Sequence, residues 1–271
     1  MTDKKENAKR LGIYLLFIAL SDIMFVFLRK SINNSQTAYF IFGHVFWCSS
    51  PAIASLITRA VTKEGFRDMK LHLHLKGNLR WYLLAFFLPM IGSSAMPIMG
   101  ARGNIDVPSF TAILSTILQL AALTAVMSLD LLGEELGWRG YMNQKMEPLI
   151  GTAGTCLLGG IVWGLWHCPM DIDAYLSGAG SGSALMINCC ERTLLLMCFG
   201  VFLMWLTKKT DSVFPAVLAH YMYNGTDAAM QMLLGDASNE ESVFMYLPYL
   251  IVAIVFMVLL LRDKKKTEKT E

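Results

Sequence analysis

Charged residues are scarcer in this sequence than in a typical soluble domain. Of the 271 residues, 16% are charged, whereas a soluble domain carries about a quarter. The 55% that are hydrophobic come in long runs rather than in alternating or one-face patterns. Because a helix of about 20 apolar residues crosses a bilayer, these runs leave no sizeable soluble domain. The sequence therefore predicts a single transmembrane domain over residues 1–271, in contact with the lipid bilayer.

The motifs of several other protein classes are also missing. The six cysteines lie in or beside apolar runs without zinc-finger spacing, so we expect them to be small buried hydrophobic residues. No His-Glu-x-x-His zinc motif occurs. No internal repeat is found, so an inverted-repeat transporter is not suggested. The net charge of +2 by itself says nothing about nucleic acid. The basic residues lie near the ends of the apolar runs, where a membrane protein needs them, and we expect no nucleic acid partner.

The apolar runs that are present have the length of transmembrane helices. We predict an all-α membrane protein, a polytopic bundle of about eight transmembrane helices. An even number of crossings places both termini on the same side of the membrane. The predicted spans are residues 11–28, 38–58, 81–99, 109–133, 152–168, 184–206, 213–233 and 243–261.

The distribution of basic residues predicts which side that is. With both termini cytoplasmic, only Arg29, Lys30 and Arg102 among the loop Lys and Arg residues fall outside the cell, as the positive-inside rule requires. Residues 262–271 then form a charged cytoplasmic tail. Arg192 lies within a span, and we expect it either to pair with Asp171 or Asp173 or to extend outward to the membrane surface.

Ionisable groups within the spans are the first place to look for function, because burying them in lipid is unfavourable. Glu134, Glu135 and Arg139 form the first group. Glu135 and Arg139 are four residues apart with the acid first, which favours an ion pair on a helix. Glu134 points about 100° away and is free to act as a general base on water. The competing interpretation is a surface ion-pair cluster at a helix end.

Two further groups follow on separate spans. His167 lies at the end of Trp163-Gly164-Leu165-Trp166-His167, where we expect Pro169 to disrupt the helix; a packing histidine is the competing interpretation. His220 and Asn224 are four residues apart and share a helix face, and both can donate hydrogen bonds to an oxyanion. For the three groups to lie at the same depth in the membrane, the fourth span must continue past Arg139. It is then too long for one straight crossing, so we expect a helix break near Ser128-Leu129-Asp130 or at Gly133.

At these residues the sequence resembles the CAAX-protease and bacteriocin-processing family of intramembrane endopeptidases, whose relatives include the prenyl-protein Ras-converting enzyme and lysostaphin resistance protein A-like domains. The family pattern is Glu-Glu-x-x-x-Arg, Phe-x-x-x-His and His-x-x-x-Asn or Asp. The first and third motifs are intact here, while Trp163 stands where phenylalanine is usual and His167 is kept. The resemblance covers residues 128–226, the predicted functional core.

The resemblance implies a role for each matching residue. Glu134 corresponds to the catalytic glutamate, and His167 to the residue that helps it to activate water. His220 and Asn224 correspond to the oxyanion donors, and Glu135 and Arg139 to a supporting pair. A glutamate-activated water without a cofactor is the favoured mechanism. A zinc ion held by Glu134, His167 and His220 is the alternative, although Asn224 is a poor zinc ligand.

Two hypotheses of function follow. The first is an intramembrane endopeptidase of the cell membrane, acting on membrane-associated peptides or proteins. Bacterial relatives are linked with bacteriocin immunity, so a prenylated substrate is not required. The second hypothesis is a non-enzymatic immunity or regulatory scaffold that binds a protein or peptide partner without cutting it.

Overall fold

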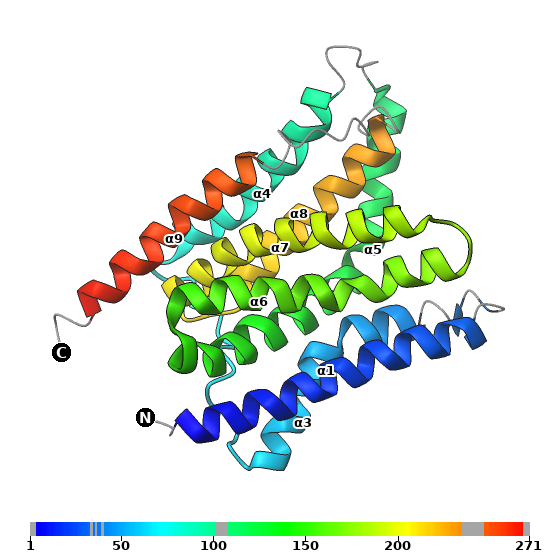
Figure 1. The fold of residues 1–271 in the computed structure, drawn as a ribbon. Helices are drawn as coiled ribbons and strands as arrows, with labels where there is room; N and C mark the ends of the chain where they lie inside the picture. Colours follow the sequence, from blue (N-terminus) through cyan, green and yellow to red (C-terminus); the bar gives the residue numbers. More distant parts are fainter. Residues whose placement is uncertain are drawn as a thin grey trace.

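Every regular element in the described part of this computed structural model is helical (Figure 1). The structure describes residues 4–32, 35, 37–38, 41–100, 108–234 and 247–267. Two of the elements, η1 and η2, are π-helical. The elements are α1 (Lys4–Ile32), η1 (Ile41–Cys48), α3 (Ser50–Thr62), α4 (Leu79–Gly100), α5 (Phe110–Gly137), η2 (Trp138–Met142), α6 (Asn143–Leu176), α7 (Gly182–Thr210), α8 (Phe214–Leu234) and α9 (Leu247–Thr267).

The all-helical class was predicted correctly, whereas the number of membrane crossings is not confirmed. Three segments among the described residues are long and apolar enough to cross a membrane: 4–28, 128–176 and 182–210. A fourth is reached only if η1 and α3, which are bent by 44°, count as one span. The predicted spans 213–233 and 243–261 correspond to α8 and α9, but residues 243–246 lie outside the described residues, as do 39–40 of the second span and 268–271 of the predicted tail.

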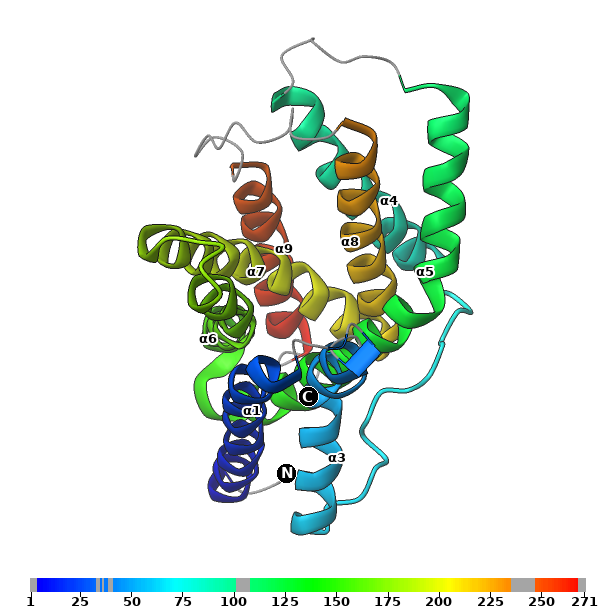
Figure 2. The same ribbon diagram turned by 90° about the vertical axis from the view of Figure 1, so that its right-hand side faces the viewer.

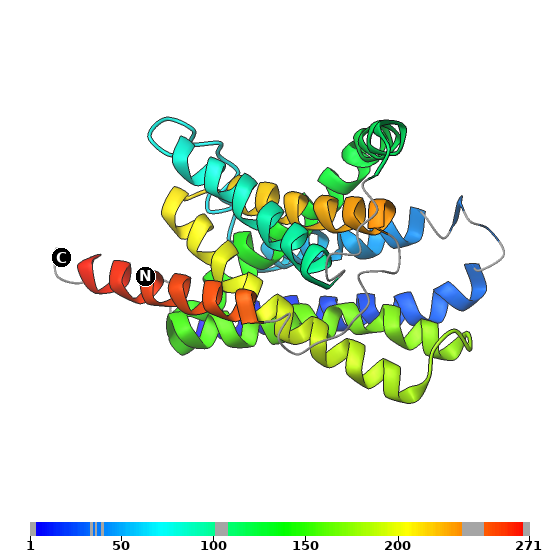
Figure 3. The same ribbon diagram turned by 90° about the horizontal axis from the view of Figure 1, so that it is seen from above.

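Both ends of the described chain lie on one side of the bundle. Figures 1 and 3 show the start of α1 and the end of α9 at the same side. An even number of crossings requires this arrangement. The cytoplasmic location of that side depends on the distribution of basic residues, and it stays a prediction.

Helices α6 and α7 form the long antiparallel hairpin at the centre of the molecule (Figure 1). Serine hydroxyls cap the helices on the far side of the bundle: Ser181 Oγ accepts from the backbone N–H of Ala184 at the start of α7 (3.1 Å). Arg192 in α7 pairs with Asp171 in α6 at 3.1 Å, which is one of the alternatives left open by the sequence. The two helices approach closely because Gly160 and Gly164 face the backbone of α7. A Cβ atom at Gly164 would lie 2.6 Å from the Cα atom of Thr193.

Two predicted irregularities were wrong. Helix α5 runs without a break through Ser128 and Gly133 to Gly137. The chain departs from regular α-helix instead in η2 and at Gly151, whose φ of 75° kinks α6. Helix α6 also continues through Pro169 to Leu176, so His167 lies inside a helix and not at its end. Proline removes one backbone hydrogen bond, and packing against α7 maintains the helix across it.

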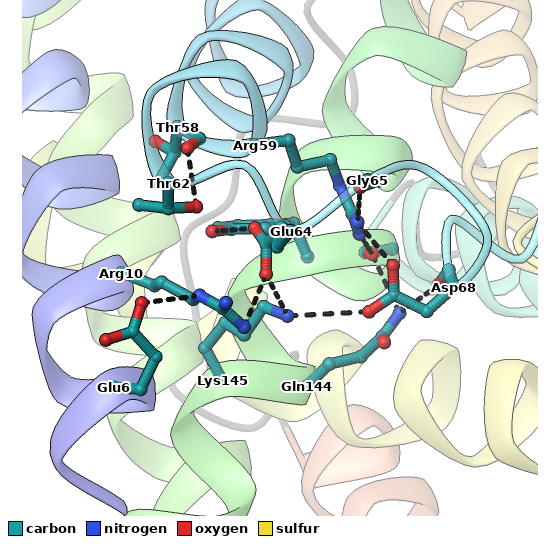
Figure 4. A network of polar contacts seen from close by, with 12 residues as sticks. Glu6, Arg10, Thr58, Arg59, Thr62, Glu64, Gly65, Asp68, Gln144 and Lys145 are labelled. Atoms are coloured by element: carbon teal, nitrogen blue, oxygen red, sulfur yellow. Dashed lines mark hydrogen bonds and ion pairs between the residues drawn. The ribbon is translucent and has the colours of Figure 1, made fainter. Parts of the chain in front are cut away.

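A network of buried charges fixes the segment between α3 and α4 against the start of α6 (Figure 4). The Glu64 carboxylate pairs with Arg10 of α1 at 2.9 Å and with Lys145 of α6 at 2.8 Å. It also accepts a hydrogen bond from Tyr141 of η2 at 2.6 Å. Because the partners come from three separate elements, the network holds η2, which carries Arg139, in a defined position.

The same network includes Arg59, which is buried at the end of α3. Its guanidinium donates to the carbonyl of Gly65 at 2.9 Å and pairs with Asp68. Partial burial alone would raise the pKa of Asp68. The hydrogen bond and charge of Arg59, together with the charge of Lys145, outweigh that effect and hold the pKa below its ordinary value of 3.8. The pair therefore fastens the 63–78 segment most firmly when Asp68 is ionised.

Candidate active site

The three predicted motifs lie on four elements that meet at the centre of the bundle. Glu134 and Glu135 are in the last turn of α5, and Arg139 is in η2. His167 is in α6, while His220 and Asn224 are one turn apart in α8. Figure 2 shows the lower part of α5 beside the lower part of α8. Segments far apart in the sequence therefore bring these side chains into one region.

Glu134 is held by a tryptophan of α6. Its side chain is only 5% exposed, and its Oε2 atom accepts a hydrogen bond from the Trp163 indole nitrogen at 2.8 Å. A buried carboxylate needs such a donor, since leaving it unsatisfied is strongly unfavourable. The contact fixes one carboxylate oxygen and directs the other away from the indole.

Glu135 has a different set of partners. It is fully buried, and its Oε1 atom accepts from Arg139 at 2.9 Å, which is the ion pair that the spacing predicted. The same oxygen also accepts from Nδ1 of His220 at 2.9 Å. This second bond was not predicted. It means that the supporting pair reaches the third motif directly and orients the His220 ring.

His167 is oriented by its own helix. Its Nδ1 atom lies 2.9 Å from the backbone carbonyl oxygen of Trp163. A carbonyl oxygen can only accept, so the neutral ring carries its proton on Nδ1 and leaves the lone pair on Nε2. The Trp166 ring packs edge-on against His167 with centroids 4.7 Å apart. His167 therefore presents a hydrogen-bond acceptor at a fixed position.

Trp163 is the residue around which the site is assembled. Its ring lies 5.2 Å from His220 and 6.1 Å from His167, centroid to centroid. The guanidinium carbon of Arg139 lies 4.1 Å above the same ring, a cation–π contact. The sequence singled out Trp163 only as a departure from a family pattern. Its part in joining the motifs was missed, because an indole N–H reveals its acceptor only in three dimensions.

Asn224 completes the third motif one turn after His220. Its side chain is partly exposed, whereas His220 is buried. The spacing of four residues keeps both side chains on one face of α8. Asn224 therefore lies on the face of α8 that carries His220, and its amide is partly accessible.

Close packing of glycine fixes the end of α5 against α3. A Cβ atom at Gly137 would lie 2.2 Å from Cβ of Pro51, so no larger residue fits without moving a helix. Gly137 follows Glu134 by three residues. The close contact therefore sets the depth and rotation of the two glutamates.

The residues of the proposed zinc alternative do not fit a metal as they stand. Within the described ranges, no three His, Cys, Asp or Glu side chains converge closely enough to hold an ion. One donor atom each of Glu134 and His220 is already bonded within the protein. Three convergent ligands are the minimum of a catalytic zinc site, so we derive no step through a metal.

An apolar cavity of about 220 Å³ lies beside the site. Helices α4, α7, α8 and α9 line it, and Phe199 and Tyr223 separate it from the polar residues. The Phe199 ring is 6.0 Å from His220 and 5.0 Å from Tyr223. An apolar group bound there would pack on Phe199, whose ring in turn contacts His220.

Comparison with known proteins agrees with the resemblance in the motifs. Residues 113–226 match the family described as Type II CAAX prenyl endopeptidase Rce1-like, a range that includes the predicted core and all six motif residues. The chain is also similar to CAAX prenyl protease 2 of Methanococcus maripaludis, with 24% identity over 140 residues. That match covers 49% of this chain and 46% of the relative, so the chain spans about half the length of the curated relative it matches. The resemblance to CAAX proteases is confirmed, and the chain is an integral, multi-pass membrane protein.

Proposed function

We propose that this protein is an intramembrane endopeptidase in which Glu134 activates a water molecule. The observation that carries the proposal is the position of Glu134, a buried carboxylate bonded to Trp163, whose ring contacts both His167 and His220. A carboxylate beside two imidazoles in a region with little water is suited to general acid–base chemistry. The similarity to CAAX prenyl endopeptidases supports the same reaction class.

In this mechanism Glu134 and His167 share the attacking water. Glu134 Oε2 is engaged by Trp163, so Oε1 takes the proton from the water as its oxygen attacks the peptide carbonyl carbon. The lone pair on His167 Nε2 accepts the second hydrogen of the water and orients it. When the tetrahedral intermediate collapses, the C–N bond breaks and Glu134 returns its proton to the leaving amine nitrogen. The proton balance is complete without an external group.

His220 and Asn224 stabilise the negative charge that develops on the carbonyl oxygen. The Nδ1 proton of His220 is committed to Glu135, so an oxyanion bond from this ring uses the proton of Nε2. The ring then carries both protons, and the oxyanion to which it donates balances its positive charge. The Asn224 amide supplies a neutral second donor. Two positioned donors are the usual minimum for stabilising a tetrahedral intermediate.

The substrate is a membrane-associated peptide or protein with an apolar group near the bond to be cut. The cavity behind Phe199 and Tyr223 has room for such a group, and binding it removes apolar surface from water. The name of the relative from Methanococcus maripaludis points to a prenylated protein. The alternative occupant of the cavity is a large apolar side chain of an unmodified peptide.

A cleavage assay with one substitution tests the proposal. The purified protein in lipid nanodiscs is incubated with a prenylated peptide ending in a CAAX sequence and with its unprenylated twin. The wild type should cut at least one of them, and Glu134→Gln should not, because an amide cannot accept the proton. Asp263→Asn, on α9 and paired with Lys209, is the matched control and should keep its activity.

The non-enzymatic scaffold is the outcome that would replace this proposal. A scaffold would bind the peptides without cutting them in any variant. In that case Glu134→Gln would restore the phenotype of a deletion strain to the same extent as the wild type. Full cleavage by a folded Glu134→Gln variant would end the assignment of Glu134 as the base.

A further inference from the structure

Trp163 differs in one chemical respect from the phenylalanine usual in the resembled family. Both residues supply an aromatic ring, but only tryptophan has a ring N–H that can donate a hydrogen bond. That N–H is directed to Glu134 Oε2 at 2.8 Å, and the side chain is 1% exposed. The substitution therefore adds a donor at the residue assigned as the general base.

We propose that Trp163 is a positioning residue of this enzyme, whose indole N–H holds Glu134 so that its free oxygen faces the attacking water. The inference rests on the proposed function of Glu134 and adds a component to it. Hydrogen bonds from a neutral donor to a charged acceptor are stronger than bonds between neutral groups. A carboxylate held in this way loses the freedom to rotate about its terminal torsion, which is otherwise broad.

The indole is itself held in place from several directions. Arg139 lies over one part of the ring at 4.1 Å, and Phe199 of α7 stacks on it with centroids 6.3 Å apart. The His220 ring packs edge to face with the indole, with centroids 5.2 Å apart. Gly164, the next residue, lets α7 approach so closely that the Trp163 backbone is fixed as well. A rigid donor positions its acceptor more effectively than a mobile one.

Trp163 also connects the base to its partner histidine. Its side chain donates to Glu134, while its backbone carbonyl accepts the Nδ1 proton of His167. One residue thus sets the positions of both the carboxylate and the imidazole that share the water. The relative placement of these two groups is the quantity on which water activation depends, because reacting atoms must be aligned to within fractions of an ångström.

The first test is the kinetic effect of Trp163→Phe, which keeps an aromatic ring and removes the donor. We expect kcat for the peptide cut by the wild type to fall about ten- to hundred-fold, the range of a lost hydrogen bond to a charged group. KM should change by no more than about three-fold, because the indole does not contact the substrate in the proposed mechanism. A purely structural role would instead lower the folded fraction and leave kcat per folded molecule unchanged.

Trp205→Phe is the matched control for this substitution. Trp205 is a buried tryptophan of α7 that packs on Trp81 and Phe256, away from the motifs. Removing its indole introduces the same loss of volume in the same bundle. Trp205→Phe should keep the wild-type kcat, and a loss equal to that of Trp163→Phe would overturn the positioning role.

A second measurement reports on the hydrogen bond without any turnover. The protein has six tryptophans, so labelling with indole-¹⁵N gives a small set of N–H resonances, and Trp163→Phe identifies the one from Trp163. In Glu134→Gln that resonance should shift the most, because its acceptor loses its charge. The Trp166 resonance should stay in place, since its N–H donates to Ser50 at 3.1 Å.

The outcomes separate the two proposals. If the wild type cuts a peptide and Trp163→Phe keeps its kcat, the positioning role is overturned and the endopeptidase remains. If no peptide is cut by the wild type, the proposed function fails, and the Trp163 resonance alone decides whether the indole holds Glu134. Where Trp163→Phe fails to fold, Trp→Phe variants of the other five tryptophans assign the Trp163 resonance by elimination. An unmoved Trp163 resonance in Glu134→Gln contradicts the positioning role.

Discussion

His220 donates its Nδ1 proton to Glu135, at 2.9 Å, and not to the adjacent Glu134. The same carboxylate oxygen of Glu135 accepts from Arg139. The two neighbouring glutamates therefore have separate partners: Glu135 is bonded to an arginine and a histidine, and Glu134 to a tryptophan. This division gives two adjacent carboxylates with nearly the same burial different surroundings, as the proposed mechanism requires.

The first prediction concerns the loss of charge at Glu135. Glu135→Gln leaves the buried Arg139 guanidinium without its counter-ion, and removing one partner of a buried ion pair costs about 3–5 kcal/mol of stability. It also weakens the bond that orients His220. We expect a lower melting temperature in detergent and a loss of cleavage, measured by a thermal shift assay and the peptide assay.

A double variant serves as its control. In Glu135→Gln with Arg139→Met no unpaired buried charge remains, and replacing a whole buried pair with neutral or apolar residues is often close to neutral. The double variant should therefore melt above Glu135→Gln while remaining inactive. A double variant that melts below Glu135→Gln would show that the charge pair is not the source of the instability.

The helical class and the residues of the three motifs were predictable from the sequence, because both depend on local pattern. Long apolar runs specify helices in lipid, and residues four apart share a helix face. The Glu135–Arg139 pair followed from the second rule, whereas Asp171 was only one of the alternatives offered for Arg192. The irregularities did not: the expected break in α5 is absent, and the kink lies at Gly151. Such features depend on packing between helices, which spacing along one helix does not contain.

Prediction of the site from the sequence was limited in the same way, because contacts between helices are not contained in the spacing along one helix. Spacing identified the residues that carry charge, but not which of them bond to one another. The links from Trp163 to Glu134 and from His220 to Glu135 join positions 29 and 85 residues apart, and no periodicity reports contacts at such separations. The network around Glu64 was missed for the same reason, since Arg10, Tyr141 and Lys145 come from distant segments.

The second prediction tests the close approach of α6 and α7. Gly164→Ala places a Cβ atom 2.4 Å from Oγ1 of Thr193, so the helices must separate, and overpacking of this kind costs about 1–3 kcal/mol. The matched control is Gly12→Ala in α1, where nothing lies within 4 Å. It should be neutral or stabilising by about 0.5–1 kcal/mol, because alanine favours a helix. Equal melting temperatures for the two variants would contradict the close contact.

The third prediction uses the lowered pKa of Asp68, which lies outside the spans. A carboxyl group whose pKa is lower in the folded state stabilises the fold above its unfolded pKa and loses that effect as pH falls through the folded pKa. Asp68→Asn should therefore lower the melting temperature at neutral pH, and the difference from the wild type should shrink below pH 3.8. Asp263→Asn, which breaks an exposed pair with Lys209, should change stability by less than about 1 kcal/mol. A difference between wild type and Asp68→Asn that grows toward acid pH would reverse the sign of this linkage.

The fourth prediction separates the glutamate mechanism from the zinc alternative. Glu134 Oε2 and His220 Nδ1 are bonded to Trp163 and Glu135, and the Nδ1 proton of His167 is bonded to a carbonyl. To bind zinc, Glu134 Oε1 and the Nε2 atoms of His167 and His220 would have to converge on one ion, each at about 2 Å from it. We expect purified protein to contain substoichiometric zinc by mass spectrometry and to keep its peptide cleavage after dialysis against a strong chelator. Cleavage that disappears on dialysis and returns with one equivalent of zinc, but not in Glu134→Gln, would establish the metal site and show that the three side chains rearrange to form it.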